Sequence, residues 1–258
     1  MSFKDIVVFL DASQACEMRV VTAIALAKRF DARLKGVDLR NESALDGLWM
    51  DRAVSLQDWF EASGREARVD TMYLFSHGDL ASKDLYVHYA DLFVASQVHF
   101  QSPNVRDESI HEDILLNAGI PGIILPSEWN GGALGSSIMI AWNASREATR
   151  AVHDALPLLI TANKVTVFTH DRVKTAMDSD LEALLDHLAR HGVTATVDHW
   201  LDDGQTSLIA AIFALLDRNG TDLIVAGAYG KSRMFEGVFG GVTKDLLSQP
   251  SMPVLLSH

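Results

Sequence analysis

Short apolar runs alternate along the second half of the chain with stretches in which apolar residues recur at helical spacing. The runs are rich in β-branched residues and have the length of strands; they lie at 137–142, 164–169, 193–200, 223–226 and 253–257. The helical stretches lie at 146–160, 181–191 and 208–216. Strands that alternate with helices predict a parallel sheet covered on both faces. Pro157 is expected to disturb the last turn of the first of these helices.

The first half follows the same plan, and three of its segments recur in the second half in the same order. The matching pairs are 6–13 (IVVFLDAS) with 138–145 (IMIAWNAS), 91–95 (DLFVA) with 222–226 (DLIVA), and 113–125 with 245–257. This repeat predicts two homologous α/β domains, 1–129 and 135–258, joined by a polar, glycine-bearing linker. In the first domain, strands are predicted at 7–10, 34–39 and 69–75, and helices at 17–30, 41–63 and 82–89.

The composition is that of a packed globular protein with an excess of acidic residues. Hydrophobic residues make up 48% of the chain, charged residues make up 22%, and the formal net charge is −12. The negative charge argues against binding to nucleic acid or to an anionic membrane, since both need a basic face. No apolar run approaches the length of a membrane span. The single cysteine fits a reducing compartment, and the N-terminus lacks the apolar core of a signal peptide, so we expect a cytoplasmic protein.

The most informative stretch, DLIVAGAYGKSRMFEGVFGGVT, begins at Asp222. Its short apolar strand is followed by Gly227 and Gly230, and after nine further residues by Gly240. Glycines after a strand let the backbone approach a ligand, and the N–H groups at a helix start favour an anion, so the stretch predicts a phosphate cradle. It is not a Walker A loop, because Val225 stands where that loop needs glycine, and it does not have the Rossmann spacing either.

The pattern Gly-x2-Gly-x9-Gly resembles the nucleotide-binding signature of the universal stress protein family. The resemblance covers nearly the whole chain as a tandem pair, and it implies two doubly wound parallel-sheet domains with strand order 3-2-1-4-5. It also implies an adenine nucleotide in the second domain, namely ATP with or without Mg²⁺, and hence a stress-response or regulatory role. The residues expected around this nucleotide are Ala141, Asn143, Thr169, His170, Ala226, Gly227, Gly230, Gly240, Gly241, Val242 and Thr243.

Three of these positions depart from the family pattern. The residue after the last glycine is normally Ser or Thr, but here it is Gly241, and a hydroxyl follows only at Thr243. The Asp that normally follows the first strand is replaced by Asn143, whose amide can still hydrogen-bond a base or ribose. His170 stands where an apolar residue is usual, and either stacks on the base or is an ordinary strand-end residue.

The first domain lacks the glycine loop. Its counterpart, residues 95–109, contains no glycine, and Glu108 occupies the position that matches Gly240. A carboxylate there would repel phosphate, so we expect one nucleotide site per chain, in the second domain. The sequence shows no general base and no metal-binding pair of carboxylates, so we expect slow ATP hydrolysis at most.

Two other functions stay open on the sequence alone. The altered glycine loop and Asn143 also fit a scaffold that binds no nucleotide and recognises a protein partner. The aromatic residues Trp49, Trp59 and Phe60 of the first half fit either domain packing or a cavity for an apolar small molecule. The last strands of the two domains are expected to pair as an intramolecular pseudo-dimer, and a homodimer is a further possibility.

Cysteine and histidine chemistry is a weaker expectation. Cys16 lies at the start of a predicted helix, where a thiolate would be stabilised, but no motif places a base beside it. His187 and His191 share a helix face and could chelate a metal ion. The residues between them lack the usual glutamate, so a solvated helix face is the preferred interpretation and no metal is expected.

Overall fold

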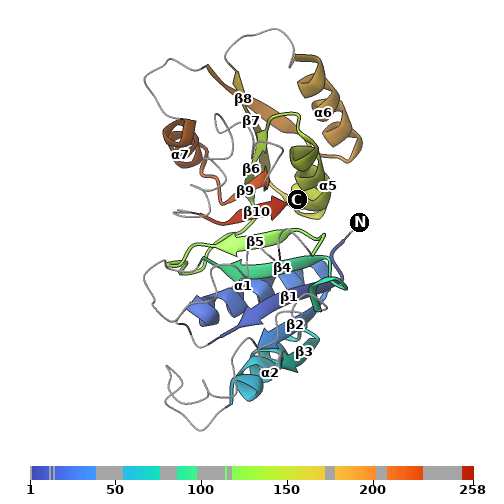
Figure 1. Ribbon diagram of the computed structural model, residues 1–258, viewed down its shortest axis with the longest axis vertical. Coiled ribbons are helices and arrows are strands. Elements are labelled where there is room, and N and C mark those ends of the chain that lie inside the picture. The colour runs from blue at the N-terminus through green and yellow to red at the C-terminus, as the bar shows by residue number, and fades with distance from the viewer. Residues whose placement is uncertain are drawn as a thin grey trace. The chain divides into compact units, whose positions relative to one another are not determined.

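The computed structural model describes residues 2–11, 13, 15–38, 55–75, 86–97, 114, 118–171, 178–201, 208–228 and 252–258. The chain divides into two compact units, Met1–Gly131 and Gly132–His258, and each is described by itself. Each unit is a sheet with helices packed against it (Figure 1).

The first unit is an open parallel sheet with its first strand at the centre. In chain order its elements are β1 (Asp5–Leu10), α1 (Ala15–Phe30), β2 (Arg33–Asp38), α2 (Leu56–Ala67), β3 (Thr71–Phe75), β4 (Leu92–Ser96) and β5 (Gly122–Leu125). The strands lie in the order β3-β2-β1-β4-β5, and every pairing between them is parallel. Strands β1, β4 and β5 are almost continuously apolar and buried, as strands of a parallel sheet covered on both faces should be.

The second unit repeats this plan. Its elements are β6 (Ser137–Trp142), α5 (Arg146–Thr161), β7 (Lys164–Asp171), α6 (Asp178–Arg190), β8 (Ala195–Leu201), α7 (Leu208–Asn219), β9 (Leu223–Gly227) and β10 (Val254–Ser257). The strands lie in the order β8-β7-β6-β9-β10, again all parallel. Numbered within the unit this order is 3-2-1-4-5, so the predicted fold class is confirmed. Helices α5 and α6 lie on one face of this sheet and α7 on the other (Figure 1).

The two units can be aligned residue by residue at the ends of α2 and α6. Both helices end at a left-handed residue, Arg68 (φ 60°) in the first unit and Gly192 (φ 78°) in the second. The N–H of the next residue then bonds back to a carbonyl five residues earlier, from Val69 to Gly64 and from Val193 to Leu188. Counting back along the two helices, Trp59 and Phe60 of the first unit correspond to Ala183 and Leu184 of the second.

Pro157 lies inside helix α5 and does not end it. Helix α5 continues past the proline to Thr161. A proline inside a helix removes one backbone hydrogen bond and tends to kink or end it. Here the residues on both sides of Pro157 are buried, so packing against the sheet holds the last turn in place.

Candidate functional site

The second unit has a topological switch point between its neighbouring strands β6 and β9. Strand β6 pairs with β7 on one side and with β9 on the other, and β9 in turn pairs with β10. The chain therefore leaves β6 and β9 in opposite directions across the sheet. Open α/β sheets bind ligands in the crevice at the carboxyl ends of such a strand pair. Here those ends are Trp142 and Gly227.

Asn143 forms the turn that follows β6. Its side-chain oxygen accepts a hydrogen bond from the N–H of Ser145 at 3.1 Å, and Ala144 between them is left-handed, with φ 56°. Ser145 then caps α5, because its hydroxyl oxygen accepts from the N–H of Ala148 at 3.1 Å. The side-chain NH₂ group of Asn143 has no bonding partner among the described residues, so this half-buried amide keeps two donors for a ligand.

Gly227 lies at the end of β9 and lets the start of α5 come close. A Cβ at this position would lie 2.5 Å from the carbonyl carbon of Glu147 and 2.6 Å from the backbone nitrogen of Ala148. Backbone atoms cannot move aside cheaply, so close packing of the helix against the strand requires glycine here. This packing requirement accounts for Gly227 independently of any ligand.

Thr169 and His170, at the end of β7, lie on opposite faces of the sheet, because successive residues of a strand alternate. The hydroxyl of Thr169 lies 2.8 Å from Nδ1 of His199 on β8. The ring of His170 stacks on Trp200, with ring centres 4.8 Å apart and planes 26° apart. A base in the crevice would therefore meet these two side chains on different faces of the sheet. Trp200 already covers one face of the His170 ring, so a base could not stack on that face.

The remaining predicted site residues divide between the strands and a segment outside the described residues. Ala141 and Ala226 lie in the neighbouring strands β6 and β9, close to their carboxyl ends. Gly230, Gly240, Gly241, Val242 and Thr243 lie outside the described residues, as does Glu108 of the first unit. Their expected contacts with phosphate stay predictions.

In the first unit the corresponding strand end is occupied by an internal ion pair. Arg19 is 3% exposed; its Nε donates to the carbonyl of Phe9 at 2.7 Å and its Nη2 to Oδ2 of Asp11 at 2.6 Å. The N–H of Ser13 also donates to Asp11, at 2.7 Å. Burial would raise the pKa of Asp11, but the Arg19 charge and the bonds from Ser13 outweigh it and lower that pKa. The carboxylate of Asp11 is thus bonded to residues of its own unit.

The helix start does not stabilise a thiolate at Cys16. Cys16 lies in the first turn of α1, but its side chain is fully buried. Burial raises the pKa of the thiol, because a thiolate would have to be desolvated, and this outweighs the nearby Arg19 charge. Cys16 is therefore a small apolar residue of the core.

His187 on α6 and His191, which directly follows this helix, do not form a solvated row. His187 is half-buried and lies between two other imidazoles, with ring centres 5.0 Å from His153 on α5 and 4.7 Å from His191. Burial comes first among the causes that lower the pKa of His187, followed by the neighbouring His153 and His191. Within the described ranges, no group of three or more His, Cys, Asp or Glu side chains is placed to hold a metal ion.

A cleft that the sequence did not indicate lies between α5 and α6. It is lined by Trp142, Ala144, Thr149, Val152, His153, Asp180, Ala183, Leu184 and His187. None of the eleven predicted nucleotide-site residues lines it. The only sequence signal was the i, i+4 pair His187 and His191, of which His187 lines the cleft.

Comparisons with known proteins bear on the fold. No protein-family model and no curated protein matches the chain, and no helix in the described part is both long and apolar enough to cross a membrane. Solved structures do match over almost the full length. A universal stress protein from Archaeoglobus fulgidus DSM 4304 has a TM-score of 0.69 at 12% identity, with 98% of this chain and 97% of that one covered.

Two structures from Pseudomonas aeruginosa agree with it. A functionally unknown protein from strain PAO1 has a TM-score of 0.64 at 13% identity, with 99% of this chain and 92% of that one covered. A putative universal stress protein from strain UCBPP-PA14 has a TM-score of 0.59 at 12% identity, with 99% and 93% covered. At such low identity these likenesses show the fold alone. The resemblance inferred from the sequence is confirmed at that level: the chain has the fold of the tandem universal stress proteins.

Proposed function

We propose that the second unit binds an adenine nucleotide at the switch point between β6 and β9, and that the protein acts as a stress-response regulator through this site. The observation that carries the proposal is the half-buried amide of Asn143, which has its NH₂ group uncommitted at the end of β6. It stands beside the N-terminus of α5, where helix dipole and free N–H groups favour an anion. The glycine spacing after β9 supplies the expected phosphate loop.

The first unit supports the proposal by contrast. Its residue at the matching position, Asp11, is held by Arg19 and Ser13. Its loop carries Glu108 in place of glycine. One nucleotide per chain is therefore proposed. We propose binding without rapid turnover, because the sequence places no general base beside the glycine loop.

The test is calorimetric titration of the full chain with ATP and Mg²⁺. We expect one site per chain, and we expect the Gly230→Val variant to lose it because a branched side chain would block the backbone from the phosphates. The matched control is Gly192→Ala, which strains a left-handed residue at the end of α6 without any atom within 4 Å of the added methyl group. It should cost stability and keep ATP binding.

The outcomes separate this function from the alternative. Loss of binding in both variants would show that Gly230→Val acts through stability alone. No heat and no thermal stabilisation of the unmodified protein at millimolar ATP would overturn nucleotide binding and favour a scaffold that recognises a protein partner.

A further inference from the structure

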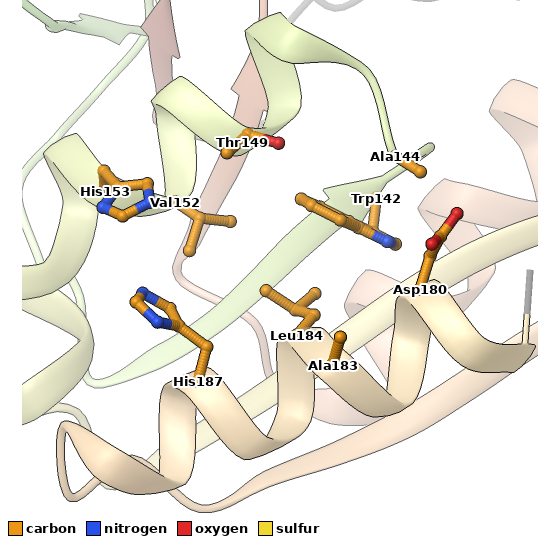
Figure 2. Close-up of a pocket in the computed structure, with 9 residues that line it drawn as sticks. All are labelled: Trp142, Ala144, Thr149, Val152, His153, Asp180, Ala183, Leu184 and His187. Atoms are coloured by element: carbon orange, nitrogen blue, oxygen red, sulfur yellow. The ribbon is translucent and has the colours of Figure 1, made fainter.

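The cleft between α5 and α6 has an apolar floor and two polar ends. Its volume is about 310 Å³, which is within the range of small-molecule pockets. Val152 and Leu184 point into the space from opposite helices (Figure 2). At one end the indole nitrogen of Trp142 lies on the side toward Asp180, and at the other end the imidazoles of His153 and His187 face each other (Figure 2).

Two polar atoms in the wall of this cleft are buried without a hydrogen bond. They are Nε1 of Trp142 and Nε2 of His187, and no described residue bonds to either. Trp142 as a whole is only 7% exposed. A buried polar group without a partner costs about 1–3 kcal/mol, and such groups are rare in native proteins. Both atoms belong to side chains that line the same cavity, so an occupant of the cavity is the natural source of the missing partners.

The first unit carries aromatic side chains at the two matching helix positions. Phe60, at the position of Leu184, is fully buried and packs so closely on the sheet that a Cβ on Gly36 would lie 2.7 Å from its ring. Trp59 stands at the position of Ala183. The second unit therefore has small side chains on α6 where the first has two aromatic rings.

The polar groups at the Trp142 end select the chemistry of an occupant. The indole N–H can only donate, so it needs an acceptor. The carboxylate of Asp180, at the exposed rim, needs a donor. A hydroxyl group meets both needs at once. A carboxylate would be repelled by Asp180, and an ammonium group would leave the indole N–H without its acceptor.

We propose that this cleft is a second ligand site, for a small uncharged molecule with an apolar ring and a hydroxyl group. The ring lies on Val152 and Leu184, and the hydroxyl accepts from Trp142 Nε1 and donates to Asp180. His153 and His187 close the far end. This site shares no residue with the proposed nucleotide site, so the two proposals can be tested separately.

The test follows the indole N–H signal of Trp142 by NMR during titration with benzyl alcohol. The chain has five tryptophans, so the signals are few, and the Trp142→Phe variant assigns the one of interest. We expect a saturable downfield shift of this signal. Trp129 is the internal control, because its Nε1 already donates to Thr22 Oγ1 at 2.9 Å and its signal should stay in place.

Three related probes test the proposed chemistry. Toluene lacks the hydroxyl and should bind at least tenfold more weakly than benzyl alcohol, a difference of about 1.4 kcal/mol. Benzylammonium and benzoate carry the two charges and should also bind more weakly. Tighter binding of either ion would overturn the assignment of an uncharged ligand, and no shift of the Trp142 signal with any probe would overturn the site.

Two variants test the location by restoring the first unit's residues. Leu184→Phe introduces the ring found at Phe60, and Ala183→Trp introduces the ring found at Trp59. Each should abolish the benzyl alcohol shift. Ala183 is exposed on the rim, so its replacement keeps the test valid if Leu184→Phe does not fold. Unchanged binding in a folded Ala183→Trp or Leu184→Phe variant would place the ligand elsewhere and overturn the proposal.

Discussion

The two units share one fold, but they differ in the side chains that the second helix of each carries at matched positions. In the first unit Phe60 is fully buried and its ring packs against Gly36. In the second unit Leu184 stands at the matching position and lines the cleft of about 310 Å³ between α5 and α6. The same helix position can therefore be closed core in one unit and border a cleft in the other.

A second difference lies at the carboxyl end of the central strand. The first unit has Asp11 with Arg19 bonded to it, whereas the second has Asn143, and Ala151 stands at the position that matches Arg19. The first unit uses this place for an internal ion pair. The second unit leaves an amide there for other partners, as a binding site requires.

The largest effect on stability is expected from truncating the side chains at the matched helix positions 60 and 184. Phe60→Ala should lower the free energy of unfolding of the first unit by about 3–5 kcal/mol, since it removes a fully buried ring. Leu184→Ala should cost the second unit less, about 2 kcal/mol, because this side chain already borders a cavity. Hydrogen exchange, followed on peptides from each unit, measures both. Equal losses of unfolding free energy would show that the two matched positions are packed equally tightly.

Breaking the ion pair of the first unit should have the next effect. Arg19→Ala should cost about 2–3 kcal/mol, because it leaves the Phe9 carbonyl and a partly buried carboxylate without their partner. The double variant Arg19→Ala with Asp11→Asn copies the Asn143 and Ala151 combination of the second unit and should regain part of this loss. Denaturant unfolding measures both, and a double variant no better than the single one would show that the charge of Asp11 is unimportant.

The matched strand ends β4 and β9 should differ in their tolerance of a side chain. Gly227→Ala should destabilise the second unit by about 1–3 kcal/mol, because the added methyl group meets the backbone of α5. The first unit carries Ser96 at the matching position, so Ser96→Ala should cost less than about 1 kcal/mol. Thermal unfolding of the two variants compares them directly. If Gly227→Ala does not lower the stability, packing against α5 does not require glycine here, and ligand binding is the remaining explanation for this residue.

The smallest effect is a difference in acid sensitivity. The pKa of His187 is lowered, so the unfolded state takes up its proton first as the pH falls, and the second unit loses stability from pH 6.5 down to the folded pKa. The pKa of Asp11 is also lowered, so its contribution to the stability of the first unit is lost only below the ordinary aspartate pKa of 3.8. As the pH falls from 7 to 5.5, protection against hydrogen exchange should weaken in the second unit alone.

Two variants check that assignment. His187→Leu should remove this part of the pH dependence, and His191→Leu, which changes the exposed neighbour, should largely keep it. Loss of protection at the same pH in both units would show that His187 is not its source.

The sequence alone determined the elements and their repetition. Apolar runs and helical spacing predicted the strands and helices, because these patterns reflect local backbone geometry and the need to bury one face. The repeat implied two similar units, and the glycine spacing pointed to the family whose fold the structure shows.

Only the tertiary structure decided what shares a site. The role of Gly227 depends on how close α5 comes to β9, and the cleft depends on side chains of β6, α5 and α6, which are distant in the sequence. The burial of Cys16, which reversed the expected effect of the helix start on its thiol, likewise depends on what packs around it. Patterns along a chain report which face of an element is buried, whereas a cavity is the small volume left over when several such faces meet.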